Sequence, residues 1–188
     1  MSPVTLSFPQ FPECSVHVTV WCKISNTAAI KQQLMEGNQN YGHFAFINSD
    51  MVTSKAHLYS AIYRTLTNQV NGTMTSRNLN SEATISLSMN NKKITDNLKK
   101  FGINEHSERI IVLEFFEENG VDHCDSLKTL IEGEEAEFTD AFLRAHINWG
   151  ELIKVYKLDK NKEMYYKEEQ NREELFNVLN GSIQLNGF

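Results

Sequence analysis

The sequence predicts a single α+β domain over residues 1–188, with helices packed on an antiparallel or mixed β-sheet. Apolar residues alternate with polar ones in some stretches and recur at helical spacing in others. These two kinds of segment do not alternate strictly, and several connections are short, which disfavours a parallel sheet wound through crossover helices. A chain of 188 residues, 40% of them apolar, can bury one substantial core.

Four stretches have the pattern of β-strands. Residues 15–22 alternate between apolar and polar side chains, which is typical of a strand covered mainly on one side. Residues 44–47 form a short apolar run that reads as a buried strand. Residues 79–89 alternate again, and residues 109–116 are almost continuously apolar, so we expect the last stretch to be central in the sheet.

The clearest helix begins at Ser54 and runs to about residue 69. Leu58, Ile62 and Leu66 form one apolar row, and Tyr59, Tyr63 and Val70 lie beside it. The combined stripe is wider than a helix needs to face one core. Such a helix is either deeply buried or shared with a partner, and the pattern leaves both possibilities open.

Shorter helices are indicated by their caps. Asn26 begins a helix that Gly37 ends, and Thr95 begins one that Gly102 closes as a left-handed residue. Further helical patterns cover residues 126–132, 139–146, 149–157 and 173–180. Residues 160–171 are polar and weakly patterned, so we expect a loop or linker before the last helix. The tail, 183–188, is apolar at alternate positions, and we expect it to dock on the domain.

Charge and composition exclude some classes of function. A net charge of −6 argues against a free-standing nucleic-acid binder, although basic residues gather between positions 55 and 109. No apolar run reaches the roughly 20 residues that span a bilayer, so no membrane partner is expected. Cys14, Cys22 and Cys124 are odd in number and widely spaced, which suits reduced thiols in a cytosolic or nuclear protein.

Residues that could carry chemistry are few, and no cofactor is expected. The sequence has no P-loop, dinucleotide fingerprint or nucleophile elbow. His123 and Cys124, flanked by Asp122 and Asp125, are the one adjacent pair of soft metal ligands. Because neighbours on an extended chain point to opposite faces, a polar loop is the favoured interpretation and no metal is expected.

His57 and His43 could act as general bases, but no partner for either is visible, so a structural role is favoured for both.

The segment 77–82 allows two interpretations. It places polar residues between a glycine break and an alternating stretch. Its Asn and Ser side chains could tie off the backbone of a turn. Alternatively, Arg77 could contact a phosphate group, with the Asn and Ser side chains offering further hydrogen bonds. The sequence does not decide between the two.

Several motifs together resemble one family. They occur in the order Phe11-Pro12-Glu13, Ala61-Ile62-Tyr63-Arg64, Met74-Thr75-Ser76-Arg77-Asn78-Leu79-Asn80-Ser81-Glu82, Leu98-Lys99-Lys100-Phe101-Gly102-Ile103 and Val155-Tyr156-Lys157-Leu158. They resemble the PRPK-binding small regulatory subunits (TPRKB/CGI type) of the eukaryotic KEOPS complex, also called EKC. The Arg-x-Leu-x-Ser/Thr-Glu and Lys-Phe-Gly-Ile elements are the more specific ones.

The resemblance implies an α+β fold and a non-catalytic role. Such a subunit would bind and stimulate the atypical kinase/ATPase subunit, associate indirectly with the other KEOPS subunits, and help to hold tRNA for threonylcarbamoyladenosine modification next to the anticodon. It would work in the nucleus and cytoplasm, with reported links to telomere maintenance.

The resemblance also suggests site residues. Arg77 would contact tRNA phosphate, with Arg64 and Lys55 as further contacts, and Tyr59, Ile62 and Tyr63 would contact the kinase subunit. Many members carry an arginine before the terminal glycine, which is absent from residues 184–188 here. Two alternatives stay open: a small enzyme or ligand-binding domain with a site centred on His57 or His123, and an independent RNA-binding domain.

Overall fold

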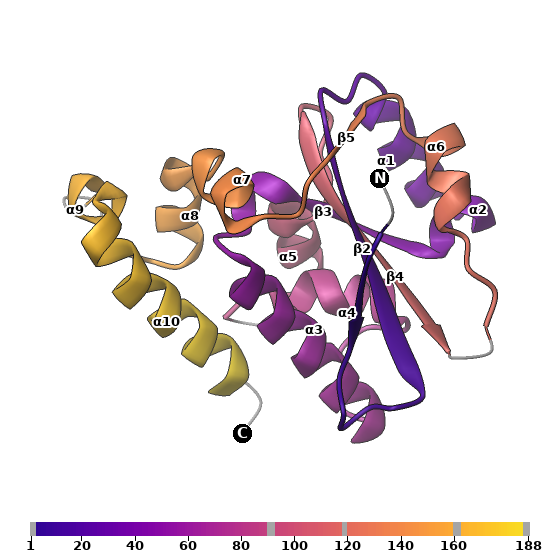
Figure 1. Ribbon diagram of the computed structural model, residues 1–188, viewed down its shortest axis with the longest axis horizontal. Helices are drawn as coiled ribbons and strands as arrows, with labels where there is room; N and C mark the ends of the chain where they lie inside the picture. Colours follow the sequence, from indigo (N-terminus) through magenta and orange to yellow (C-terminus); the bar gives the residue numbers. More distant parts are fainter. Residues whose placement is uncertain (1–2, 90–92, 118–119, 160–162, 186–188) are drawn as a thin grey trace.

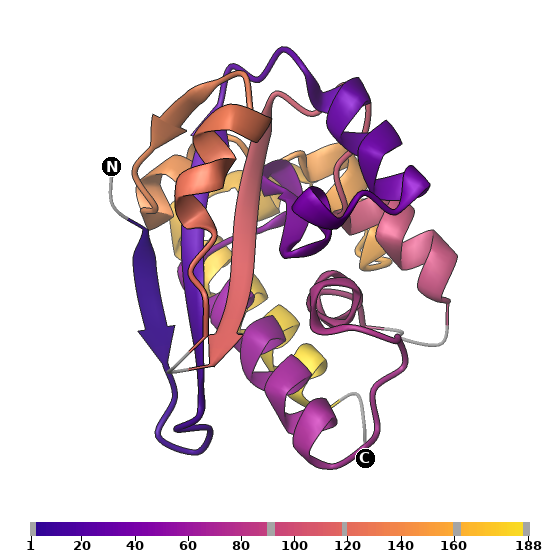
Figure 2. The same ribbon diagram turned by 90° about the vertical axis from the view of Figure 1, so that its right-hand side faces the viewer.

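The computed structural model describes residues 3–89, 93–117, 120–159 and 163–185. Within these residues, five strands form one antiparallel sheet that lies between two groups of helices (Figures 1 and 2). The predicted α+β class with an antiparallel sheet is therefore confirmed. None of the described helices combines the length and the apolar character that a membrane crossing requires.

The elements have the following bounds. The strands are β1 (Val4–Ser7), β2 (Cys14–Cys22), β3 (Phe44–Asn48), β4 (Arg109–Glu117) and β5 (Glu134–Ala136). The helices are α1 (Thr27–Glu36), α2 (Gln39–Gly42), α3 (Lys55–Val70), α4 (Leu79–Ser86), α5 (Ile94–Phe101), α6 (Leu127–Leu130), α7 (Asp140–Ala145), α8 (Trp149–Val155), α9 (Glu163–Lys167) and α10 (Glu169–Leu185), with 3₁₀ turns η1 (Ser49–Met51) and η2 (Cys124–Ser126).

The sheet has the order β1-β2-β4-β3, with β5 also paired to β2. The continuously apolar strand β4 is therefore central, as predicted, because it pairs with β2 on one side and β3 on the other. Val16, Val18 and Val20 of β2 pack into a core with α3 and α4. Trp21 belongs to a second core on the opposite face, shared with α1 and α6. Alternation along β2 thus separates two cores, one on each face of the sheet. Figure 2 shows the sheet with helices on both sides of it.

The wide apolar stripe of α3 is explained by burial on two sides. Its N-cap is Ser54, whose Oγ accepts a hydrogen bond from the His57 amide at 3.1 Å, as the sequence predicted. The sheet and α4 cover one side of α3, and α10 lies alongside the other (Figure 1). The Arg64 Nη1 donates to the Ile183 carbonyl at 2.7 Å and the Gln184 Nε2 donates to the Ser60 carbonyl at 2.9 Å.

The prediction of a strand at residues 79–89 is wrong, because Leu79–Ser86 forms helix α4. The Asn78 side chain caps this helix by accepting the Ser81 amide at 2.8 Å. Ala83, Ile85 and Leu87 are buried, but Thr84 and Ser86 between them are buried too. A helix enclosed on all sides needs no amphipathic stripe, so its sequence can imitate the alternation of a strand.

Three predicted capping roles are also corrected. Gly102 has an extended backbone with φ of −77° rather than a left-handed one; a Cβ there would lie 2.5 Å from the Leu98 carbonyl oxygen. Close approach therefore explains this glycine. Thr95 lies inside the first turn of α5, after Lys93. Asn26 precedes α1, but its side chain bonds Leu130 and Glu132 instead of the helix.

The C-terminal region is more helical than predicted. The sequence predicts a loop or linker over residues 160–171, but residues 163–167 form α9 and residues 169–171 begin α10, which continues to Leu185. Residues 160–162 lie outside the described part of the chain. The outward side of α10 is mostly polar but exposes Val178, and the inner side carries Leu175, Phe176, Leu179 and Ile183, which are buried. Docking of the tail is confirmed for Ile183, whereas Leu185 is exposed and positions 186–188 lie outside the described residues. The helix predicted at 126–132 shortens to α6, and β5 was not predicted.

Candidate partner-binding surfaces and a polar cluster

A stripe of apolar side chains runs along one side of α3. Tyr59, Tyr63, Leu66 and Val70 follow one another at helical spacing, and we call them the α3 stripe. Both tyrosines are half-buried, Leu66 is buried, and Val70 is 72% exposed. The stripe therefore emerges from the core toward solvent at its C-terminal end. Ile62, expected from the sequence to contact a partner, lies outside the stripe and is completely buried in the core.

Aromatic contacts hold the two tyrosines in place. The Tyr59 ring meets Phe138 edge-on with centroids 6.2 Å apart. The Tyr63 ring meets Phe8 at 5.8 Å and Phe11 at 5.3 Å, both from the segment between β1 and β2. Such edge-to-face pairs fix ring orientation and contribute on the order of 1 kcal/mol each. The exposed parts of the tyrosines thus belong to a preorganised surface.

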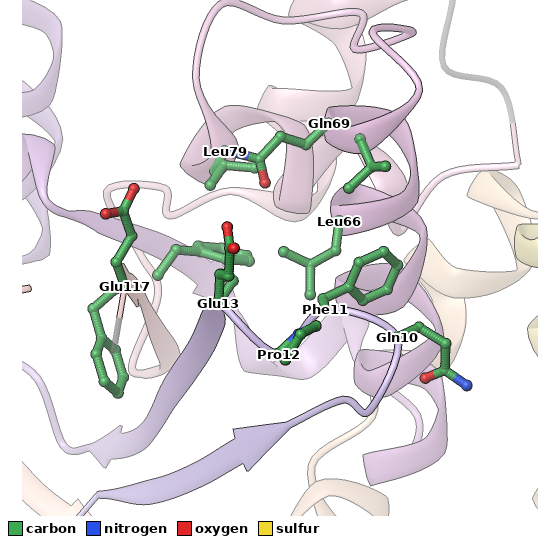
Figure 3. A pocket seen from close by; sticks show the side chains of 12 residues that line it. Gln10, Phe11, Pro12, Glu13, Leu66, Gln69, Leu79 and Glu117 are labelled. Carbon is green, nitrogen blue, oxygen red and sulfur yellow. The ribbon is translucent and has the colours of Figure 1, made fainter. Parts of the chain in front are cut away.

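The stripe ends at a hollow of about 540 Å³ beside the tip of the β1–β2 connection. Figure 3 shows Leu66 and Phe11 on one side of it, with Glu13 and Glu117 lying toward the sheet. Val70 and Leu79 also line the hollow. It combines apolar walls with two carboxylates, a combination that suits an apolar side chain accompanied by a basic one.

Lys55 and Arg64, the further expected tRNA contacts, have different surroundings. The Lys55 amide donates to Asp140 Oδ1 at 2.7 Å, and its Nζ lies 5.6 Å from the centre of the Phe138 ring. Arg64 is 6% exposed and bonds the Ile183 carbonyl. Burial lowers the pKa of Arg64, opposed by the charge of Glu82. Arg64 therefore joins α3 to α10.

Arg77 lies on a connection, residues 73–78, that a buried carboxylate organises. Glu82 is completely buried in α4. Its Oε2 accepts the amides of Thr75 at 2.9 Å and Ser76 at 2.8 Å and the Ser76 hydroxyl at 2.9 Å. Its Oε1 accepts from Asn68 Nδ2 on α3 at 2.9 Å. This Arg77 loop is thereby fixed to both helices.

The two interpretations of the segment 77–82 now apply to different residues. Asn78 caps α4, and the Asn80 Nδ2 donates to the Gly42 carbonyl at 2.7 Å, so these amides are structural. Arg77 is exposed and has no hydrogen bond or ion pair to any residue that the structure describes. Its guanidinium is available for an external anion.

A groove of about 680 Å³ runs beside the Arg77 loop, bounded by α1, β3, α4 and α5. Leu34, Phe44, Leu98 and Ile103 give it apolar walls. Its rim is polar and partly basic, formed by Lys31, Asn78, Asn80, Ser81, Lys99 and Asn104. Apolar walls with basic side chains at the rim suit unpaired bases joined by phosphates.

His57, the centre of the rival enzymatic interpretation, is completely enclosed. Its Nδ1 accepts the Thr53 amide at 3.1 Å. Its Nε2 donates to the Tyr156 oxygen at 2.9 Å, and that hydroxyl donates to the Leu87 carbonyl at 2.7 Å. Burial lowers the pKa of His57 to about 4, so the ring is neutral at pH 7. Both ring nitrogens are engaged within the fold, which is the arrangement of a structural histidine.

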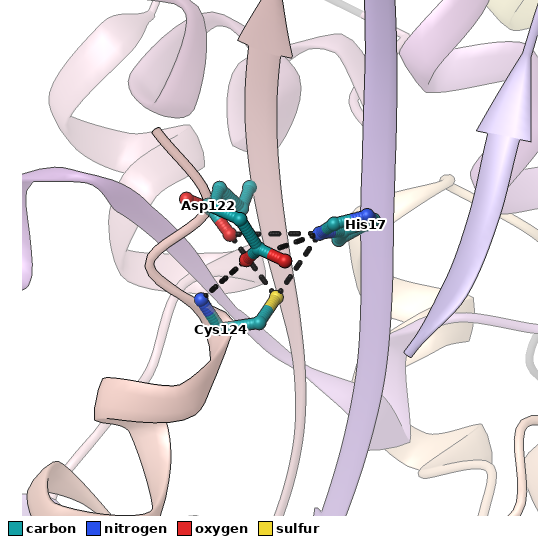
Figure 4. Close-up of side chains that lie close together, drawn as sticks. His17, Asp122 and Cys124 are labelled. Atoms are coloured by element: carbon teal, nitrogen blue, oxygen red, sulfur yellow. Dashed lines mark hydrogen bonds and ion pairs between the residues drawn. The ribbon is translucent and has the colours of Figure 1, made fainter. Parts of the chain in front are cut away.

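Four potential metal ligands meet on the opposite face of the sheet, and we call them the His17 cluster. It comprises His17, Glu114, Asp122 and Cys124, whose donor atoms all lie within 4.8 Å of one another. Figure 4 shows Asp122 and Cys124 turned toward the His17 ring across the sheet surface. Asp125 is fully exposed and takes no part. His123 instead places its Nδ1 2.9 Å from Glu114 Oε1 and stacks on His43.

The sequence singled out Asp122, His123 and Cys124 but not His17 or Glu114. One signal was present: Glu114 is a carboxylate inside the apolar strand β4, and such a residue needs a partner. Burial, the Glu114 carboxylate and Asp122 raise the pKa of the Cys124 thiol, which therefore donates a hydrogen bond to Glu114 Oε2 at 3.0 Å.

Comparisons with known proteins agree with the sequence motifs. Residues 21–187 match the family model described as "Kinase binding protein CGI-121". The chain is 34% identical to the EKC/KEOPS complex subunit cgi121 of Aspergillus fumigatus, over 82% of each chain. It is 34% identical to that of Schizosaccharomyces pombe, over 80% of this chain and 86% of the relative. Identity to the Candida albicans subunit is 32%, over 87% and 90% respectively.

Proposed function

Because this chain belongs to the CGI-121 family of kinase-binding proteins, we propose that it is the kinase-binding subunit of an EKC/KEOPS complex. In that role it binds and stimulates the kinase/ATPase subunit and contributes no reacting group. The family match over residues 21–187 carries the proposal. The names of the fungal relatives, which are subunits of that complex, support it.

The α3 stripe is the surface that we assign to the kinase subunit. Tyr59 and Tyr63 are aromatic, half-exposed and held by neighbouring rings, which are the properties of residues that dominate interface energies. Val70 and the adjoining hollow extend the surface without a break. An interface centred there should bury about 1,200–2,000 Å² in total. Ile62, being enclosed, contributes through the core.

The assignment is tested by Val70→Asp and Tyr63→Ala, with Val178→Asp as the matched control. Val70 and Val178 are both exposed valines at helix surfaces, but Val178 lies on α10. In co-elution and ATPase assays with the purified kinase subunit, we expect Val70→Asp and Tyr63→Ala to weaken binding at least about tenfold. Val178→Asp should bind as the wild type does.

Two results would contradict parts of this proposal separately. Wild-type protein that does not bind the kinase subunit at micromolar concentration would refute the kinase-binding function. Loss of binding by Val178→Asp, with Val70→Asp unaffected, would move the interface to α10 and leave the function intact.

The same subunit, we propose, also holds tRNA through the Arg77 loop and the adjoining groove. Arg77 is exposed and without a partner among the described residues, and the Glu82 carboxylate fixes the loop that carries it. Lys99 is exposed on the opposite rim. These side chains would contact phosphates, while bases of an unpaired tRNA segment occupy the apolar groove.

Arg77→Glu tests this part, with Lys154→Glu on α8 as a control that changes the net charge equally. Lys154 forms an ion pair with Glu151 at an exposed site, so its replacement should change the free energy of unfolding very little. We expect Arg77→Glu to reduce tRNA affinity about tenfold and to leave kinase binding intact. Equal losses with both variants would indicate a general charge effect, and loss of kinase binding with Arg77→Glu would make Arg77 structural.

A further inference from the structure

We propose that the His17 cluster binds one divalent ion of the zinc class. His17 Nδ1, Glu114 Oε2, Asp122 Oδ1 and Cys124 Sγ are the donor atoms. This site lies on the sheet face opposite α3, so it is separate from the kinase surface proposed above.

The spacing of the donor atoms fits a small tetrahedral ion. Zinc bonds of about 2.0–2.3 Å separate neighbouring ligand atoms of a tetrahedron by about 3.3–3.8 Å. His17 Nδ1 lies 3.3 Å from Cys124 Sγ, 3.5 Å from Asp122 Oδ1 and 3.7 Å from Glu114 Oε2. Cys124 Sγ lies 3.0 Å from Glu114 Oε2. Small side-chain shifts would bring all four to bonding distance of one centre.

The fold presents these donors from rigid positions. His17 and Glu114 are direct cross-strand partners of β2 and β4, so the sheet register brings them together. Asp122 and Cys124 are two residues apart, and Asp122 Oδ1 accepts the Cys124 amide at 2.8 Å. These contacts hold residues 122–124 against the sheet surface.

A second set of contacts orients Glu114. Its Oε1 accepts the His123 amide at 2.8 Å and lies 2.9 Å from His123 Nδ1. Its Oε2 is left facing the cluster. Outer contacts of this kind are typical of metal ligands. The carboxylate is only 2% exposed and has the Asp122 carboxylate close by, so a cation would compensate buried negative charge.

The donor types favour zinc over hard cations. One sulfur and one imidazole nitrogen suit Zn²⁺, whereas Mg²⁺ and Ca²⁺ prefer oxygen alone. On binding, the S–H bond of Cys124 breaks, the sulfur electron pair forms the bond to the metal, and the proton leaves to solvent. Four protein ligands close the site, so the ion would be structural and would join residues 122–124 to β2 and β4.

The experiment uses the full chain, stripped with chelator and titrated with ZnCl₂ against a chromophoric competitor. Co²⁺ substitution provides a second readout, because thiolate ligation gives a charge-transfer absorption band. We expect one ion per chain for the wild type. Cys124→Ser, which keeps a hydroxyl donor for Glu114, should weaken binding about 100-fold or more and abolish the band.

Matched controls separate this site from adventitious thiols. Cys14→Ser and Cys22→Ser alter the other half-buried thiols and should bind Zn²⁺ as the wild type does. Asp125→Asn changes the exposed neighbouring carboxylate and should also have no effect. Asp122→Asn keeps the acceptor for the Cys124 amide, so it should fold normally, yet bind more weakly.

The proposal is overturned if the wild type binds no ion, or if Cys124→Ser and Asp122→Asn both bind as tightly as it does. In either case the His17 cluster is a hydrogen-bonded network alone. A zinc-dependent rise in the melting temperature of the wild type, absent in Asp122→Asn, would support the site even if Cys124→Ser fails to fold.

Discussion

At the scale of single residues, several buried polar side chains that could take part in catalysis or binding instead stabilise the fold. His57 is a potential general base, yet its two nitrogens serve the fold by bonding Thr53 and Tyr156. Glu82 fixes the loop that presents Arg77. The segment 77–82 was recognisable from sequence, but the division between structural Asn78 and available Arg77 was not, because it depends on which side chains reach the backbone.

Neutral burial of His57 makes stability depend on pH. Its pKa falls from 6.5 in the unfolded chain to about 4 in the fold, so the unfolded state binds a proton more readily. Stability is complete above pH 6.5 and declines as the pH falls toward 4, by about 2 kcal/mol at pH 5. Urea unfolding at pH 7 and pH 5 measures this difference.

His57→Gln should remove most of this pH dependence, at a cost to stability at pH 7. His106→Gln, at an exposed histidine, should retain the wild-type dependence. An unchanged slope in His57→Gln would mean that other groups cause the loss of stability.

At the scale of elements, some helices and strands could be predicted from the local sequence pattern, and others depend on tertiary packing that the pattern does not contain. The strands at 15–22, 44–47 and 109–116 and the helix from Ser54 were predictable because each buries a regular set of side chains. Helix α4 has a strand-like pattern because all of its residues from Glu82 to Ser86 are buried, polar and apolar alike. The start of α10 has a linker-like pattern because the buried residues of this helix begin only at Leu175. Likewise, the His17 cluster depends on the β2–β4 register, which no local pattern contains.

Contact between α3 and α10 rests partly on Arg64, and its replacement should loosen α10. Arg64→Met keeps the length of the side chain but leaves the Ile183 carbonyl without its donor. We expect a loss of about 1.5–3 kcal/mol of stability. Hydrogen exchange in residues 169–185 should accelerate, while tRNA affinity stays unchanged. Both are measurable on the purified chain.

Gln184→Ala is the matched control, since it removes the exposed second bond between the same helices, to the Ser60 carbonyl. Its effect should be within about 0.5 kcal/mol. If Arg64→Met reduced tRNA affinity and left hydrogen exchange in α10 unchanged, Arg64 would be a tRNA contact, as the sequence motifs suggest.

At the scale of the whole molecule, a net charge of −6 limits how the chain can hold RNA. Long-range attraction is absent, so contact must come from local groups such as Arg77 and Lys99. On the proposed function, we therefore expect the assembled complex to hold tRNA, with this chain supplying part of the surface.

Salt dependence measures the number of those contacts. For the isolated chain, the logarithm of tRNA affinity should fall against the logarithm of salt concentration with a slope of about −2. Arg77→Glu should make the slope shallower by about 1. A much steeper slope would place a larger basic surface elsewhere, and a flat one would mean that stacking alone retains the RNA.

The pairing of the sheet has a further consequence, for aggregation. Residues 110–113 of β4 form an aliphatic, uncharged run that could nucleate fibrils if it were exposed. In the fold it is paired on both sides, and the outer edge of β3 is closed by Gly102 opposite Ile47 and by the Ile103 amide bonded to Phe46. The short connection after α5 therefore covers part of a sheet edge, and we expect Gly102, whose missing Cβ permits this close approach, to hinder edge-to-edge association of native molecules.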